Sequence, residues 1–134
     1  MRYDFPLIQD FCRESGLSSC VVSNDLLEID LGEDSVLCFQ NVESDEDCAF
    51  GFKGMAWHTH DDFMFADGRG NFIEMNYLDV LSALKEGKVL VAERLQARRI
   101  TDRWLVHCEY NDELKYLEQG EEIRIWRAPR GYGK

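Results

Sequence analysis

The chain has 134 residues, of which 45% are hydrophobic and 31% are charged. This length suits one domain of ordinary size, and the composition excludes collagen-like, low-complexity and wholly disordered chains. The formal net charge of −11 at pH 7 disfavours nucleic acid as a partner, because the phosphate backbone carries the same sign. The longest apolar runs have about four residues, too few to cross a bilayer, so no membrane partner is expected. We therefore predict a single domain over residues 1–134, with a frayed tail at residues 129–134.

In chain order, the first predicted element is a helix over residues 5–15. Its apolar side chains recur with helical spacing, Asp4 can cap its start, and Gly16 follows its end. Short β-type runs follow, separated by residues that favour turns. We expect strands at residues 19–23, 26–31, 36–40, 49–53, 57–66 and 72–75.

A second helix is predicted near residues 77–86, with Asn76 as its cap and Gly87 after its end. An Asp67-Gly68 turn predicts a hairpin before this helix. After the helix the pattern returns to strands, which we expect at residues 88–95, 103–110 and 122–127. Two helices separated by runs of strands predict an α+β fold with a mainly antiparallel, meander-like sheet.

The negative charge is concentrated in the first part of the chain. Residues 1–84 hold 17 acids and four bases, whereas residues 85–134 hold nine acids and 11 bases. Ten of the acids lie in residues 14–52, which contain no Lys or Arg. Such a surface either confers solubility alone or attracts a basic protein and speeds their encounter. For the second case, we expect partner-binding residues in the acidic segment and near the first tryptophan, namely Glu43, Asp45, Glu46, Asp47, Trp57, Asp61 and Asp62.

The five cysteines indicate a reducing compartment. Their number is odd, no C-x-x-C pair occurs, and the first residues lack the unbroken apolar stretch of a secretory signal. We therefore expect free thiols and a cytoplasmic location. His107 and Cys108 are neighbours, but consecutive side chains of a strand point to opposite faces. A thiol–imidazole pair is therefore not expected there.

All three histidines are candidates for a metal site. On a strand, His58 and His60 lie on one face, as in an H-x-H chelate, and His107, Glu74 or Glu109 can supply a third ligand. The expected interpretation is that the histidines bond neighbouring carboxylates and that the protein has no cofactor. The alternative is a small metal-dependent enzyme or metal-binding protein that uses a divalent metal such as Zn. Neither G-x-S-x-G nor a phosphate-binding G-x-x-x-x-G-K motif occurs, so no catalytic residue is predicted.

Two strands near the end of the chain favour contacts with other proteins. Trp104 alternates with Cys108 and Tyr110 on one face of its strand, and Trp and Tyr are frequent anchors in interfaces. The strand at residues 122–127 alternates apolar and charged side chains. Such an edge strand either faces solvent or pairs with a second copy, so we also predict a homodimer.

In size, acidic charge and lack of a catalytic motif, the whole chain resembles the immunity proteins of bacterial polymorphic-toxin systems. This resemblance implies a protein that binds and neutralises a cognate toxin, often through an acidic face against a basic enzyme. The expected function is therefore inhibition of a basic partner by protein–protein contact. The alternative function is that of the small metal-dependent enzyme or metal-binding protein.

Overall fold

The computed structural model describes five stretches of the chain and the backbone of a sixth: residues 3–32, 34–42, 48–55, 63–111 and 119–129, with the backbone of 57–58. Contacts divide the chain into two compact units. Unit 1 is Met1–Asp61 with Pro129–Lys134, and unit 2 is Asp62–Ala128. This division does not test the single-domain prediction, which stays a prediction. The predicted frayed tail lies outside the described residues apart from Pro129.

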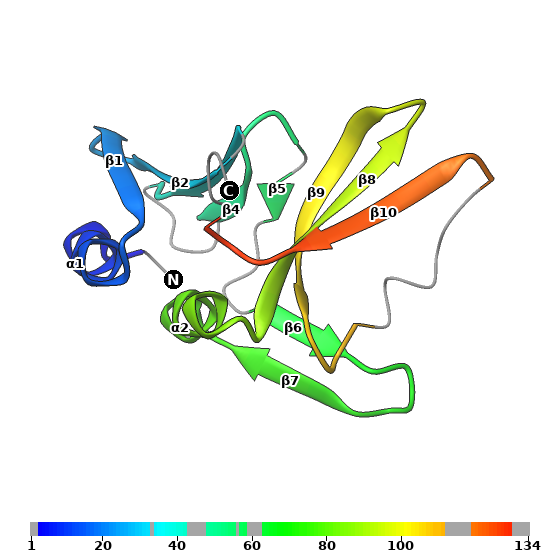
Figure 1. Ribbon diagram of the computed structural model, residues 1–134. Coiled ribbons are helices and arrows are strands. Elements are labelled where there is room, and N and C mark those ends of the chain that lie inside the picture. The colour runs from blue at the N-terminus through cyan, green and yellow to red at the C-terminus, as the bar shows by residue number, and fades with distance from the viewer. Residues whose placement is uncertain are drawn as a thin grey trace. The chain divides into compact units, whose positions relative to one another are not determined.

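Unit 1 consists of a helix and a five-stranded antiparallel sheet whose strands follow one another in chain order (Figure 1). Its elements are α1 (Phe5–Ser15), β1 (Ser18–Ser23), β2 (Leu26–Gly32), β3 (Ser35–Gln40), β4 (Ala49–Phe52) and β5 (Trp57–His58). This order confirms the predicted meander. The helix has the predicted ends: the Asp4 side chain accepts the N–H of Leu7 at 3.0 Å, and Gly16 is left-handed with a φ of 73°.

The segment that precedes α1 packs against the core of unit 1 and forms hydrogen bonds with it. Leu27 and Phe39 are opposite each other on β2 and β3, and both are fully buried. Tyr3 packs edge-on against Phe39, with ring centroids 4.9 Å apart. The N–H of Tyr3 donates to Oδ1 of Asn41 at 2.7 Å, and Nδ2 of Asn41 donates to the Tyr3 carbonyl at 2.9 Å. The buried amide of Asn41 therefore satisfies the Tyr3 backbone in place of water.

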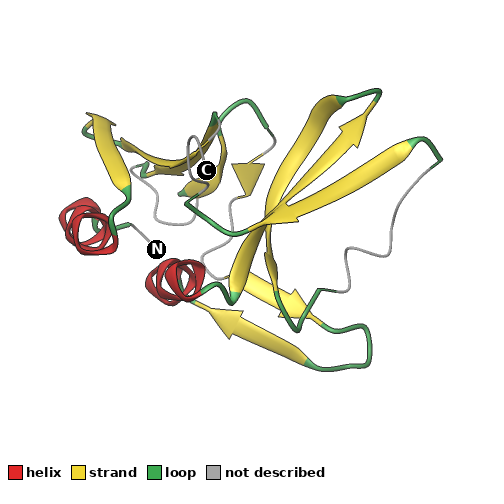
Figure 2. Cartoon of the chain, in the orientation of Figure 1, coloured by secondary structure: helices red, strands yellow, loops and turns green. Residues whose placement is uncertain are grey.

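Unit 2 contains a hairpin, a helix and a three-stranded antiparallel sheet (Figure 2). Its elements are β6 (Phe63–Ala66), β7 (Phe72–Met75), α2 (Tyr77–Glu86), β8 (Val89–Gln96), β9 (Arg99–His107) and β10 (Glu121–Trp126). The β6–β7 pair confirms the predicted hairpin, and α2 confirms the second helix, capped by Asn76. With unit 1, these elements confirm the α+β fold. Neither helix of the described part is long and apolar enough to cross a membrane.

The strand β9 differs from the prediction at both ends. It begins at Arg99 because Ala97 and Arg98 form the preceding turn, with φ of 52° and 66°. Asn and Gly usually occupy such left-handed turn positions, so the sequence did not indicate a turn there. The strand ends at His107 instead of residue 110, which changes the surroundings of the next three side chains.

Candidate functional site

The two units carry different charge. In the described residues, unit 1 has seven acids and two bases, whereas unit 2 has nine of each. Both bases in the described part of unit 1 lie against acids: Arg13 is 2.9 Å from Asp10, and Lys53 is 3.3 Å from Glu28. The described part of unit 1 therefore has an acidic surplus that its own cations do not balance.

Most of the predicted partner-binding residues lie outside the part of the chain that the structure describes. These residues are Glu43, Asp45, Glu46, Asp47, Asp61 and Asp62. Trp57 is described by its backbone, which pairs with Gly51 across β4 and β5. The acidic partner-binding surface stays a prediction, and the structure adds Asp25, Asp30 and Asp34 as exposed acids of the same unit.

Of the three predicted metal-binding histidines, the structure places one side chain. The backbone of His58 pairs with Phe50, but its side chain and the whole of His60 lie outside the described residues. His107 ends β9 and is 6% exposed. Within the described stretches, no three His, Cys, Asp or Glu side chains form a group that could hold a metal ion. The H-x-H metal site therefore stays a prediction.

His107 is enclosed by aromatic rings. Its ring centroid lies 5.8 Å from that of Phe65 on β6 and 5.1 Å from that of Tyr110, which approaches edge-on. Nδ1 accepts the backbone N–H of Glu109 at 3.0 Å, which requires the neutral ring to carry its proton on Nε2. Burial lowers the pKa of His107; the charge of Glu109 opposes this shift, and that of Lys88 adds to it. The ring is therefore neutral at pH 7.

The expectation that Cys108 cannot meet His107 is wrong. Because β9 ends at His107, strand alternation stops there, and Sγ of Cys108 lies 4.0 Å from Nδ1 of His107. Tyr110 packs against His107 for the same reason, although the sequence pattern placed it on the face of Trp104. The Nδ1 lone pair already accepts the N–H of Glu109. His107 is therefore poorly placed to take the thiol proton, as a catalytic pair requires.

A pocket of about 430 Å³ opens between the β6–β7 turn and the segment that follows β9. Its lining combines two carboxylates, two aromatic rings and an amide, contributed by Asp67, Gly70, Asn71, Phe72, Glu109 and Tyr110. Within the part of the chain that the structure describes, no Lys or Arg belongs to this lining. We call it the acidic–aromatic pocket. Sequence reasoning missed it, because its two walls come from segments about 40 residues apart that no local pattern connects.

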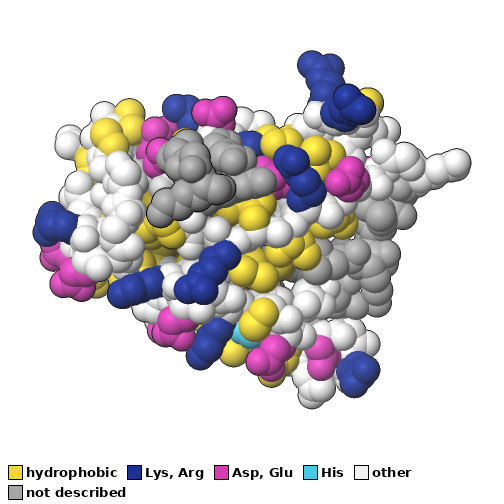
Figure 3. All heavy atoms as spheres, viewed as in Figure 1, with side chains coloured by type: hydrophobic (Ala, Val, Ile, Leu, Met, Phe, Trp, Pro, Cys, Tyr) yellow, Lys and Arg dark blue, Asp and Glu magenta, His cyan; other side chains and the backbone are white. Residues whose placement is uncertain are grey.

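The turn that forms one wall of the pocket holds a fixed negative charge. The Asp67 carboxylate accepts Nδ2–H of Asn71 at 2.9 Å, the N–H of Arg69 at 2.8 Å and the N–H of Asn71 at 3.2 Å. These hydrogen bonds, led by the Asn71 side chain, lower the pKa of Asp67, and the charge of Arg69 contributes. Phe72 follows the turn with 60% of its surface exposed. Figure 3 shows acidic and hydrophobic side chains side by side along this hairpin, at the lower edge of the view.

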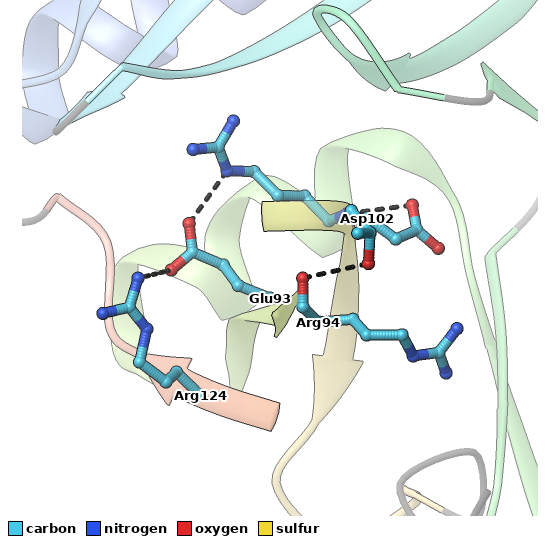
Figure 4. Close-up of polar contacts among 6 residues, drawn as sticks. Glu93, Arg94, Asp102 and Arg124 are labelled. Carbon is cyan, nitrogen blue, oxygen red and sulfur yellow. Dashed lines mark hydrogen bonds and ion pairs between the residues drawn. The ribbon is translucent and has the colours of Figure 1, made fainter. Parts of the chain in front are cut away.

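Unit 2 also contains a buried charge network on its three-stranded sheet (Figure 4). Glu93 on the central strand is 2% exposed and accepts hydrogen bonds from Nε of Arg103 at 2.8 Å and Nη2 of Arg124 at 3.3 Å. The two arginines are its direct cross-strand neighbours on β9 and β10. Because the charges compensate one another within the sheet, we assign this network a structural role.

No protein-family model, curated protein or solved structure matches this chain. The functional interpretation therefore depends on the charge of unit 1 and on the acidic–aromatic pocket of unit 2.

Proposed function

We propose that the chain is an acidic binding protein that blocks a basic protein partner, in the way that an immunity protein neutralises a toxin. The observation that carries this proposal is the acidic surplus of unit 1. Its described residues include seven acids and only two bases, and each base already forms an ion pair with an acid. A surface of one sign attracts an oppositely charged protein and raises the rate of their encounter.

The edge strand β1 of the same unit offers apolar surface beside the acids. Val21 and Val22 are 40% and 55% exposed, and the pairing with β2 is irregular between Val21 and Ser23. The neighbouring strand β2 carries Glu28 and Asp30. Apolar side chains surrounded by charged ones are typical of protein interfaces, where the apolar groups supply affinity and the charges supply orientation.

The proposal is tested by identifying the partner and then measuring its association kinetics. The tagged chain is used to capture proteins from its native host at low salt, and the captured protein is purified. We expect a basic protein whose association rate falls as salt rises, because the screening length shortens from about 10 Å at 0.1 M to about 3 Å at 1 M. Replacing the four acids of the predicted segment with Ser should slow association at low salt. These acids are Glu43, Asp45, Glu46 and Asp47.

A matched control removes four exposed acids from unit 2 and so changes the net charge equally. These acids are Glu74, Asp79, Glu86 and Glu122. The control variant should keep an association rate close to that of the unchanged chain. An acidic partner, or equal rates for the two variants, would contradict the proposal. A stoichiometric metal in the purified protein would instead support the metal-dependent alternative.

A further inference from the structure

The acidic–aromatic pocket has the chemistry of a site for an organic cation. Asp67 contributes a fixed carboxylate on the β6–β7 turn, and Glu109 contributes an exposed carboxylate on the opposite wall. Two aromatic residues, Phe72 and Tyr110, line the same cavity. Carboxylates attract a cation by charge, and aromatic rings attract it through their quadrupole.

Among the described residues, no Lys or Arg lines this cavity. The charge of Arg69 acts on Asp67, but Arg69 is not part of the lining. Nζ of Lys88 lies 3.2 Å from the Glu86 carboxylate, outside the pocket. Arg69 therefore offsets part of the charge of Asp67 from outside the lining. A positively charged group of another molecule still meets two carboxylates and no lining cation among the described residues.

The imidazole of His107, which packs against Tyr110, adds no positive charge that would repel a cation from the pocket. His107 packs edge to face with Tyr110 and is buried, and its Nδ1 accepts the N–H of Glu109. A neutral imidazole adds no positive charge beneath the Tyr110 ring. The same hydrogen bond fixes the backbone of Glu109, so the wall is arranged before a ligand arrives.

We propose that this pocket binds the side chain of an arginine presented by the basic partner. The planar guanidinium can stack on an aromatic ring while it donates hydrogen bonds to a carboxylate, which the compact ammonium of lysine does less well. This inference rests on the proposed function, which supplies the basic protein partner. It adds that unit 2 recognises an arginine side chain of that partner. Phe72, 60% exposed in the chain alone, loses contact with water when an arginine stem covers it.

The test uses the full chain, labelled with ¹⁵N, and the blocked tripeptide Gly-Arg-Gly as the probe. Matched tripeptides carry lysine or citrulline, and citrulline has the shape of arginine without its charge. We expect the arginine peptide to shift the backbone amide signals of Gly70, Asn71, Glu109 and Tyr110 in a saturable way. A single side chain of this size should bind with a dissociation constant in roughly the millimolar range. Lysine should bind more weakly, and citrulline should give no saturable shift.

Two variants separate the pocket from general charge attraction. Glu109→Gln should raise the dissociation constant about tenfold, because it removes a charge-assisted hydrogen bond. Glu122→Gln removes one exposed acid of the same unit outside the pocket and should leave binding unchanged. Phe72→Leu keeps an apolar side chain but removes the ring, and it should weaken binding several-fold. Because these side chains are exposed, amide signals remote from the pocket should stay in place in all three variants.

Equal binding of citrulline and arginine would overturn the proposal, as would equal effects of Glu109→Gln and Glu122→Gln. Equal binding of lysine would overturn the assignment to arginine, and an absence of saturable shifts would overturn the site itself. None of these results concerns unit 1. The proposed function fails separately, when the captured partner is acidic or when its association rate does not depend on the acids of unit 1.

Discussion

Replacing Glu93 with Gln tests whether the buried charge network stabilises the fold. The side chains of Glu93 and Arg103 are 3% and 9% exposed, and Oε2 of Glu93 lies 2.8 Å from Nε of Arg103. When one partner of a buried ion pair is removed, the remaining charge stays buried without compensation, which costs about 3–5 kcal/mol. Gln keeps one acceptor oxygen at this position. We therefore expect Glu93→Gln to lower the free energy of unfolding by about 3 kcal/mol, at the lower end of that range.

The two arginines of the network should contribute unequally. The Arg124 side chain is 43% exposed and lies 3.3 Å from Oε1 of Glu93. Water screens an exposed pair, so Arg124→Ala should cost less than about 1 kcal/mol. Changing Glu93 to Leu together with Arg103 to Met removes both buried charges at once. This double variant should be clearly more stable than Glu93→Gln, since apolar side chains often replace a buried ion pair without loss.

Urea unfolding followed by tryptophan fluorescence measures these differences, and the denaturant dependence shows whether the variants unfold as the unchanged chain does. A loss of less than about 1 kcal/mol for Glu93→Gln would refute the reasoning, because the pair would then behave as a surface pair. A double variant no more stable than Glu93→Gln would refute it as well, because the destabilisation would not come from an uncompensated arginine.

Three further predictions concern single side chains. Exposed Cys108 should react rapidly with a thiol reagent at pH 8, whereas Cys38, whose pKa burial raises to about 11, should react only as the fold opens; equal rates would contradict this. Burial lowers the pKa of His107 below its value in the unfolded chain, about 6.5. As the pH drops through that value, the unfolded chain takes up the proton before the folded chain does, so the free energy of unfolding should fall. His107→Gln should flatten this part of the pH profile of the urea midpoint, and an unchanged profile would assign the effect to other groups. Ser35→Ala should be neutral or stabilise by up to about 1 kcal/mol, because the buried hydroxyl has no hydrogen-bond partner among the described residues; a clear loss of stability would reveal one.

The helices and most strands could be predicted because their signals are local. The helix α1 has an acceptor at Asp4, an apolar stripe and a left-handed Gly16, and each of these acts within a few residues. The helix α2 repeats the arrangement with Asn76 and Gly87. The consecutive order of β1, β2 and β3 follows from the two-residue connections between them, because short turns favour antiparallel neighbours.

The features that escaped prediction depend on contacts between distant segments or on unusual backbone. The strand β10 pairs with β8 and not with the preceding β9, a choice that no local pattern encodes. Ala97 and Arg98 adopt left-handed conformations that their residue types do not indicate. The acidic–aromatic pocket joins Phe72 to Tyr110, and their proximity appears only once β9 has ended at His107. The alternation of side chains between the two faces of a strand holds up to His107 and does not apply to the residues after it.

In the proposed complex with a basic partner, the acidic surplus of unit 1 and the pocket of unit 2 act on different steps of binding. Charges on an exposed surface act at a distance and mainly raise the association rate, an effect that salt reduces. A pocket such as that formed by Glu109 and Phe72 acts only after contact, and interactions of this kind mainly slow dissociation. Acid-to-Ser changes in unit 1 and Glu109→Gln in unit 2 should therefore weaken the same complex by different routes. A double variant tests this separation: if the two sets of residues act independently, their effects on the binding free energy add.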